Sequence, residues 1–389
     1  MPVRPIRSGD HDALNALHRS VGWPERSPAG WRWLEANPAR LEIGGAAGWV
    51  LTDQADRPVA MVGNFIQRFR RGDRTLHGAT GFSIIVPPER KGASRNLIRA
   101  FLAQPGMFAR YTLNANARSA PIYGLFGLEP FPVQTAGMKL AWIVDALACS
   151  QGRILRRLLG GLSAETARRW GERLMNGRLF RQASLSLPAG VERLHDLSDR
   201  SDYARFWEAL VSEGRTVADR SPEMLRWRLA DPDQTLPTVL LALRRSDRIV
   251  GVAMARMAKL SLIEPPSLEI LDISALETAP DAVETLAGAL IANARALGAA
   301  KVRLQMVSPT ILAKLGDVGR RARREGGWGH CHALIADRDA AAQWSPTPFD
   351  GDYAICNRPV PPKRARNRRR SAFGSVGKAA PNPGAGYPA

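Results

Sequence analysis

Hydrophobic and polar positions follow the same order in the two halves of this 389-residue chain. Each half opens with a short β-type run, a polar turn containing Asp and an amphipathic helical stretch, at residues 3–22 and 191–214. A Trp-bearing helical stretch follows and ends at an Asn-Pro or Asp-Pro step, around Trp31 and Trp33 in the first half and Trp227 in the second. This succession predicts an internal repeat.

The remaining predicted elements also come in matching pairs. They are hairpins at 48–69 and 238–257, strands at 81–88 and 268–276, helices at 98–104 and 286–298, and final strands at 111–116 and 301–307. Because β-type runs alternate with helical runs in one order twice, the pattern predicts one α/β unit used twice.

Charge is concentrated in two connecting segments. Of the formal net charge of +19, residues 361–389 carry +7, and residues 146–190 carry +6 from eight arginines against Glu165 and Glu172. The tail is rich in Pro, Gly, Ala and Arg and has no hydrophobic periodicity, which predicts disorder from about residue 361. The other segment has apolar residues at three and four spacing between arginines, which predicts a helical linker with a surface for a membrane or nucleic acid.

The length of the chain predicts how it divides into domains, and its cysteine content predicts the cellular compartment. The chain suits two domains with connectors. The predicted division is 1–145 for a first domain, 146–190 for the linker, 191–345 for a second domain and 346–389 for a C-terminal extension. Three widely separated cysteines favour a reducing compartment, and the opening residues lack the apolar run of a signal peptide, so we expect a cytoplasmic protein. The oligomeric state is not predicted.

A polar loop lies between the strand at 81–88 and the helix that follows it. It contains Arg90, Lys91, Gly92 and Ser94. Free backbone N–H groups and the helix dipole make a helix N-terminus an anion site, and these residues add positive charge, close backbone approach and a hydroxyl. The loop therefore suits a pyrophosphate, and an ordinary strand-to-helix loop is the alternative.

The order of elements and this loop resemble the GCN5-related N-acetyltransferase family. In that family a loop of pattern (Gln/Arg)-x-x-Gly-x-(Gly/Ala) follows the fourth strand and holds the pyrophosphate of coenzyme A. Gly92 matches the pattern, whereas Glu89 and Ser94 depart from it. By this resemblance, the residues that bind the cofactor here are Arg90, Lys91, Gly92, Ala93 and Ser94.

A second match follows the strand at 111–116. Asn116, a tyrosine seven residues later at Tyr123, Gly127 and Leu128 are similar to the family's fifth-strand and fourth-helix segment, with Leu128 in place of a phenylalanine. The resemblance implies that Tyr123 is the general acid that protonates the departing thiolate, and that Asn116 contacts the cofactor. A phenol is protonated at neutral pH, as this role requires. The alternative is an aromatic side chain that only packs.

The resemblance implies a mixed α/β fold with two tandem acyltransferase-like domains, each a twisted mixed sheet flanked by helices. The implied reaction moves an acyl group from acetyl-CoA or another acyl-CoA to an amine, by direct attack on the thioester. Backbone N–H groups near Val86 would polarise the carbonyl. No general base is assigned, although His77 and Glu129 are candidates. The acceptor amine is unidentified, and an acidic or sugar-like molecule would suit a basic protein.

The second half lacks the counterparts of these residues. Its loop from Glu277 has no glycine at the key position and no basic residue, and no tyrosine follows its last strand, so it resembles a degenerate copy. Two other functions therefore stay open: an aminoacyl-tRNA-dependent transferase of related tandem fold, or a non-catalytic binding or scaffold protein. His330, Cys331 and His332 lack further obvious ligands, so no metal is expected.

Overall fold

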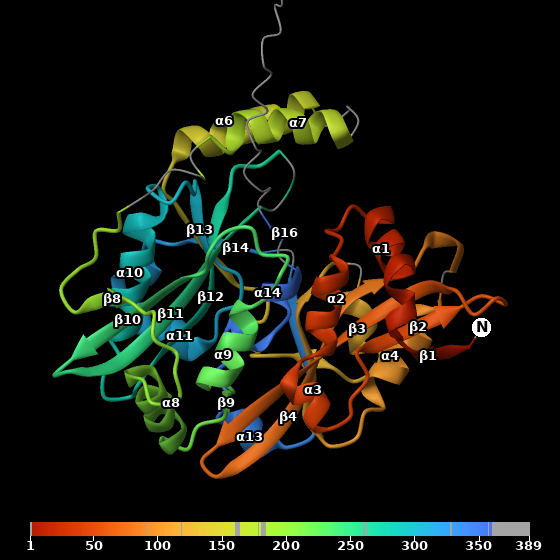
Figure 1. Cartoon of the computed structure of the whole chain (residues 1–389), viewed down its shortest axis with the longest axis horizontal. Coiled ribbons are helices and arrows are strands. Elements are labelled where there is room, and N and C mark those ends of the chain that lie inside the picture. The colour runs from red at the N-terminus through yellow and green to blue at the C-terminus, as the bar shows by residue number, and fades with distance from the viewer. Residues whose placement is uncertain are drawn as a thin grey trace, which may run out of the picture.

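The computed structural model describes residues 2–359 except 91, 118, 160–163, 178, 180–183, 260, 262, 327, 328 and 357. Lys91 and the tail predicted to be disordered from about residue 361 lie outside these described residues. The described chain forms two mixed sheets with helices around them (Figure 1). The predicted α/β class, with mixed sheets, is therefore confirmed.

The first sheet is built mainly from the first half. Its strands, in spatial order, are β1 (Val3–Pro5), β2 (Gly48–Thr52), β3 (Pro58–Arg71), β4 (Arg74–Ile85), β5 (Met107–Ala115), β15 (His330–Ile335) and β6 (Glu129–Pro130), and β9 (Val217–Ala218) pairs with β3. All neighbours are antiparallel except β4 and β5, which are parallel.

The second sheet repeats this order. Its strands are β8 (Val191–Arg193), β10 (Val239–Arg245), β11 (Arg248–Lys259), β12 (Ser267–Ala275), β13 (Lys301–Leu304), β7 (Lys139–Ile143) and β14 (Arg323–Glu325), and β16 (Arg358–Pro359) pairs with β11. Again one neighbouring pair, β12 with β13, is parallel, and the others are antiparallel.

The two sheets exchange a strand. β7 follows the first-half elements in the chain but pairs with β13 in the second sheet, and β15 follows the second-half elements but pairs with β5 in the first sheet. Strand pairing therefore crosses both predicted domain ranges, 1–145 and 191–345. Those boundaries remain a prediction about the sequence repeat, since each sheet draws strands from both ranges.

Helices cover the sheets and join them. Around the first sheet they are η1 (Ser8–Asp10), α1 (His11–Ser20), α2 (Pro28–Glu35), α3 (Pro38–Glu42), η2 (Pro88–Arg90), α4 (Ser94–Leu102) and α5 (Ala120–Gly124). Those that follow β8 are α8 (Asp202–Ser212), α9 (Pro222–Leu229), α10 (Ala282–Ala294), α11 (Pro309–Lys314), α12 (Gly316–Arg320), α13 (Arg338–Ala342), η3 (Pro348–Asp350) and α14 (Tyr353–Cys356).

The two Trp-bearing helices predicted from the sequence, α2 and α9, face each other. Each begins with a serine cap followed by proline, at Ser27 and Ser221. The Trp33 and Trp227 rings stack with centroids 4.6 Å apart and 10° between planes, and the Trp33 Nε1–H donates to the Trp227 carbonyl over 2.8 Å. The halves are therefore packed against each other through matching elements.

The apolar interior is also shared between the halves. One buried cluster contains Phe69 and Tyr111 from the first sheet together with Leu240 and Met254 from the second. Trp344 contacts the Phe69 and Tyr111 rings at centroid distances of 5.3 and 4.9 Å. Because a contiguous interior joins the sheets, they form one packed body.

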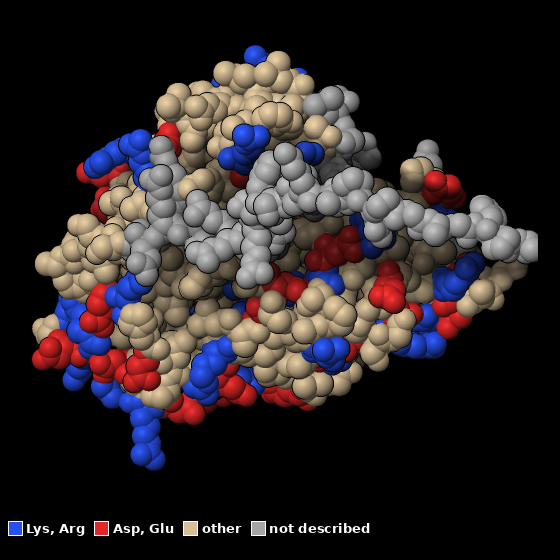
Figure 2. Space-filling view, turned by 45° about the horizontal axis from the view of Figure 1, so that its top comes forward, with Lys and Arg blue, Asp and Glu red and all other residues tan. Residues whose placement is uncertain are grey.

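The linker predicted to be helical contains α6 (Ala146–Leu159) and α7 (Ala164–Met175), which lie together beyond the second sheet (Figure 1). Gly152 of α6 packs against Pro265. Within the described residues, no helix combines the length and the apolar character needed to cross a bilayer. On the face seen in Figure 2, basic and acidic side chains are interspersed along the lower rim.

Candidate functional site

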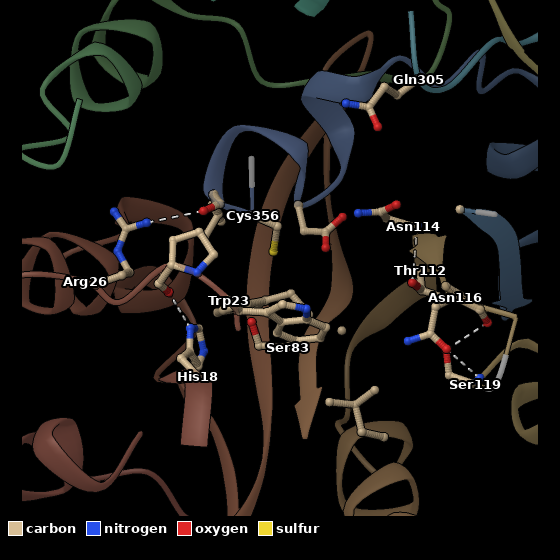
Figure 3. A pocket seen from close by; sticks show the side chains of 18 of the residues that line it. His18, Trp23, Arg26, Ser83, Thr112, Asn114, Asn116, Ser119, Gln305 and Cys356 are labelled. Atoms are coloured by element: carbon tan, nitrogen blue, oxygen red, sulfur yellow. Dashed lines mark hydrogen bonds between the residues drawn. The ribbon is translucent and has the colours of Figure 1, made fainter. Parts of the chain in front are cut away.

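The site lies where two parallel strands separate. β4 and β5 are paired from His77 with Met107 to Thr80 with Tyr111, and the pairing stops there although both strands continue. A bulge in β4, where Ser83 has a φ of 48°, shifts its register with β3 and turns the strand. Beyond this point the two strands diverge around an open space (Figure 3).

A cavity of about 360 Å³ lies between the diverging strands. Its walls come from four parts of the chain: the end of α1 and the segment after it, the bulged end of β4, the end of β5 with the turn into α5, and the second half. The lining residues are His18, Trp23, Pro24, Glu25 and Arg26; Gly81 to Ile84; Thr112, Asn114, Ala115, Asn116, Ser119 and Tyr123; and Asp233, Gln234, Lys259, Gln305, Gly329, Asp352, Ile355 and Cys356. The cavity thus lies between the halves.

Tyr123 lies in this cavity, on the short helix α5. Its side chain is almost fully buried, and its ring lies 6.4 Å from the His332 ring, with 28° between the planes. Burial raises the pKa of the Tyr123 phenol well above its usual value, and the negative charge of Asp352 raises it further. The phenol therefore keeps its proton at neutral pH.

Asn116, the second predicted residue in the cavity, orders the turn that leads to Tyr123. The Asn116 Oδ1 accepts a hydrogen bond of 2.9 Å from the Ser119 backbone N–H, and the Asn116 carbonyl accepts from the Ser119 hydroxyl over 3.2 Å (Figure 3). Asparagine favours such turns because its side chain imitates a backbone acceptor. Asn116 therefore helps to fix the start of α5.

The predicted pyrophosphate loop follows β4 directly but does not line this cavity. Ile84 lines the cavity, and Val86, two residues later, is half-buried in an apolar cluster with Leu97. Gly92 has a φ of 95° with open space around it, a conformation that favours glycine. α4 then begins at Ser94 with no side-chain cap.

The other predicted loop residues lie beside these. Arg90 ends η2, and Ala93 is the cap residue of α4. At the start of α4, the Ala93, Arg95 and Asn96 N–H groups already donate to the carbonyls of Arg90, Gly92 and Ala93. The structure therefore brings Asn116 and Tyr123 into the cavity and leaves the described loop residues outside it.

Neither sequence candidate for a general base lines the cavity. His77 lies at the opposite end of the β4–β5 pairing, with its Nε2 3.5 Å from a Glu42 carboxylate oxygen. Glu129 is exposed on β6. Several other titratable groups do line the cavity, and two of them, His18 and Asp352, have a buried polar atom without a hydrogen-bond partner. Sequence reasoning missed both.

Asp352 brings a buried carboxylate to the cavity. The residue is 4% exposed, and its Oδ1 atom has no hydrogen-bond partner. Burial raises the pKa of the Asp352 carboxyl to about 6, and a hydrogen bond with the Cys356 thiol opposes this shift. Asp352 follows η3, in a segment from the far end of the chain that reaches the first-half strands, so no local pattern marks it.

His18 brings a neutral imidazole to the opposite wall. Its Nδ1 lies 2.7 Å from the Pro24 carbonyl oxygen, which fixes the proton on Nδ1, and its buried Nε2 has no partner. Burial lowers the pKa of His18. The Trp23 and Trp31 rings meet the imidazole edge-on.

The His330–Cys331–His332 segment belongs to β15. The buried Cys331 thiol donates to the Leu113 carbonyl over 3.2 Å, and His332 lies beside Tyr123. Across the described part of the chain, no group of three or more His, Cys, Asp or Glu side chains is placed to hold a metal ion.

Comparisons with known proteins rest on structure alone. No protein-family model and no curated protein matches the sequence. The crystal structure of a GCN5-related N-acetyltransferase from Anabaena variabilis is similar over 86% of this chain and 72% of that chain, with 15% identity and a TM-score of 0.50. Saccharomyces cerevisiae N-myristoyltransferase with bound myristoyl-CoA is similar over 88% of this chain and 82% of that chain, with 10% identity and a TM-score of 0.52. The chain therefore has the fold of the GCN5-related N-acetyltransferases.

Proposed function

We propose that this protein transfers an acyl group from an acyl-CoA to an amine. The observation that carries this proposal is the cavity at the divergence of β4 and β5, with the buried, protonated phenol of Tyr123 in its wall. An acyl-CoA thioester in this opening would have a proton donor close to its leaving group. The binding of myristoyl-CoA by the yeast protein of similar fold agrees with this class of substrate.

The proposed chemistry needs no covalent enzyme intermediate. The amine nitrogen attacks the thioester carbonyl, the C–N bond forms, and the C–S bond breaks. Tyr123 gives its proton to the thiolate, a step that positioned acids accelerate by about 100- to 10,000-fold. Backbone N–H groups near Val86, beyond the β4 bulge, would stabilise the carbonyl oxygen as negative charge develops there.

The loop between β4 and α4 would hold the pyrophosphate. Gly92 lets the backbone approach closely, and Arg90 supplies charge. The Ala93 N–H already donates to the Arg90 carbonyl over 3.0 Å, so the N–H proposed as a donor to the pyrophosphate is that of Ser94, the first residue of α4. Lys91 belongs to the same proposal through its sequence position. Glu89 is the one acidic residue in this loop.

Isothermal titration with acetyl-CoA and myristoyl-CoA tests this proposal and compares acyl lengths. We expect micromolar binding that Gly92→Glu abolishes and Tyr123→Phe leaves within threefold. Gly214→Glu is the matched control, because Gly214 has a φ of 74° and open space around it but lies in the second half. It adds the same backbone strain and charge away from the loop. Absence of binding to either acyl-CoA would refute the transferase proposal and favour an aminoacyl-tRNA-dependent or non-catalytic role.

We also propose that the linker helices rest on an anionic membrane surface. Six of the twelve large hydrophobic side chains that are exposed in the described chain lie at or near α6 and α7: Ile143, Leu147, Ile154, Leu158, Trp170 and Leu174. Exposed arginines at 153, 157, 169 and 173 accompany them. Apolar side chains mixed with arginines suit a lipid interface better than a nucleic acid.

Liposome sedimentation measures this attachment. We expect the protein to sediment with vesicles that contain phosphatidylserine and not with phosphatidylcholine vesicles, and a double Ile154→Ser, Leu158→Ser variant to lose most of the bound fraction. Equal sedimentation of the variant and the unaltered protein would contradict the proposal.

A further inference from the structure

We propose that Asp352 is the proton acceptor for the amine in the transfer reaction. This inference rests on the proposed function and deepens it, because it assigns the base that sequence reasoning left unassigned. The base comes from the C-terminal segment and the acid from α5, so the reacting atoms would lie between the two halves.

Position supports this assignment first. Asp352 lines the same cavity as Tyr123, and its charge is close enough to raise the pKa of the Tyr123 phenol. A proton donor and a carboxylate therefore line one cavity of about 360 Å³. Acyl transfer to an amine is accelerated by a proton donor beside the sulfur and a proton acceptor beside the nitrogen.

The unpaired oxygen supports it next. Buried carboxylate oxygens in folded proteins are almost always hydrogen-bonded, because an unpaired one loses its hydration without compensation. Asp350 lies two residues earlier and shows the usual arrangement, since its carboxylate bonds Arg220 and Trp344. The Asp352 Oδ1 has no such partner, although its backbone carbonyl is bonded by the Ile355 and Cys356 N–H groups.

No ion pair with a neighbouring cation ties up the Asp352 carboxylate within the described residues. The Lys139 ammonium, which acts on the charge of Asp352, donates to the Gln305 carbonyl at 2.6 Å and to the Tyr353 hydroxyl at 3.0 Å. The other titratable groups that act on Asp352, or line the cavity with it, come from several elements: Tyr111, Tyr123, Cys331, Tyr353 and Cys356, with His18, Glu25, Arg26, Asp233 and Lys259 in the wider walls. Burial brings the pKa of Asp352 to about 6, nearer to neutral pH and to the value of an efficient base.

The proton balance of the step is complete. The Asp352 carboxylate takes one proton from the ammonium form of the acceptor, and the neutral amine attacks the thioester carbonyl carbon. The C–N bond forms, the C–S bond breaks, and the thiolate takes the Tyr123 proton. The new amide nitrogen then loses its second proton, which returns to Tyr123 through solvent, and Asp352 releases its proton to solvent.

His18 is the rival base, because its unprotonated Nε2 is also buried, unpaired and in the cavity wall. The groups that shift the pKa of His18 are Pro24, Arg26 and Glu25, on its own wall of the cavity, and neither Tyr123 nor Asp352 is among them. The Trp23 and Trp31 rings already pack edge-on against the His18 imidazole, with ring centroids 6.1 and 5.9 Å away, so we assign the base to Asp352 rather than to His18.

The test compares Asp352→Asn, His18→Gln and Asp233→Asn by release of coenzyme A from acetyl-CoA. The amines are ethanolamine, glucosamine and a lysine-containing tripeptide, and the pH runs from 5 to 10. Asp233→Asn is the matched control, because Asp233 lines the cavity but is bonded by the Ser27 N–H and paired with Arg26. Titration with acetyl-CoA accompanies each variant and shows whether the fold and the cofactor site survive.

For the unaltered protein we expect kcat/KM to fall tenfold per pH unit below about 6. Asp352→Asn should bind acetyl-CoA within threefold of normal, lose about 100- to 10,000-fold in kcat/KM at pH 7, and recover as the pH approaches the pKa of the amine. His18→Gln and Asp233→Asn should keep the acid limb. An Asp352→Ala variant should regain rate when sodium formate is added, which a purely structural role would not produce.

Two results would overturn the inference separately from the proposed function. If the unaltered protein transfers acetyl groups and Asp352→Asn keeps both its rate and its acid limb, Asp352 is not the base. Loss of the acid limb in His18→Gln alone would assign the base to His18. If the unaltered protein neither binds acetyl-CoA nor releases coenzyme A with any amine, the proposed function fails and this inference fails with it.

Discussion

The two sheets share one strand order but differ where their parallel strands diverge. In the first sheet the divergence of β4 and β5 holds a cavity of about 360 Å³. In the second sheet β12 and β13 are paired only from Ser267 to Glu269 on β12, and the hollow beside the free end of β12 is about 40 Å³. β12 also carries a bulge, where its register with β11 shifts next to Asp272. Both sheets therefore contain a bulged strand that separates from its parallel neighbour.

Side chains make the difference. In the second sheet the Arg220 guanidinium lines this hollow and donates to Asp272 at 2.7 and 2.8 Å, to Asp350 at 2.9 Å and to Thr347 at 3.0 Å. In the first sheet the buried carboxylate of Asp352 keeps an oxygen without a partner. One divergence is thus closed by a satisfied polar network, and the other leaves a charge to meet a ligand. Strained or unsatisfied groups often mark functional sites.

The largest expected effect comes from removing the cation that closes the second divergence. Arg220→Met leaves Asp272 and Asp350 buried without their partner, and breaking such a pair costs about 3–5 kcal/mol of unfolding free energy. Urea unfolding measures this loss. A loss below about 1 kcal/mol would show that the network does not stabilise the second sheet, and the contrast between the sheets would lose its energetic basis.

A gain in stability is expected at the first divergence. Burial raises the pKa of Asp352 from 3.8 to about 6, so the native state binds this proton more tightly than the unfolded state does. Its stability contribution therefore falls as the pH rises from about 4 to above 6, by about 3 kcal/mol at ~1.4 kcal/mol per pKa unit. Asp352→Asn should be more stable than the unaltered protein at pH 8, and the gain should vanish near pH 4.

Urea unfolding at pH 4, 6 and 8 checks this sign. The prediction is wrong if Asp352→Asn is less stable than the unaltered protein at pH 8. That result would mean that the carboxylate has a stabilising partner in the folded protein.

The smallest expected effect is at the contact between the halves. A double-mutant cycle with Trp33→Leu and Trp227→Leu should give a coupling free energy of about 0.5–1.5 kcal/mol, as for other stacked aromatic pairs. Thermal unfolding of the four proteins measures it. Additive effects of the two substitutions would show that the stacked rings do not couple the matching helices.

Much of the fold could be predicted from local pattern. The hairpins expected at 48–69 and 238–257 are formed by β2 with β3 and by β10 with β11. Alternation and turn residues act within a few positions of each other, so the sequence carries this information locally. Asn116 and Tyr123 are instead predicted through the family resemblance, and the structure places both in the cavity wall.

The strand exchange could not be predicted in this way. Nothing in the residues of β7 or β15 states which sheet edge they join, because an apolar run fits either edge. Asp352 could not be predicted for the same reason, since its place in the cavity wall with Tyr123 depends on where the C-terminal segment crosses the molecule. Long-range partners are fixed by packing of the whole chain.

The exchange of β7 and β15 also sets the order in which a ribosome can complete the molecule. During translation, β5 cannot pair with β15 until His330–Ile335 has emerged from the ribosome. The cavity lacks one wall until Asp352 and α14 have followed. Contacts so distant in sequence form late because the loop between them must close first. A chain that stops short of these residues would be translated almost in full and still lack one wall of the cavity between its halves.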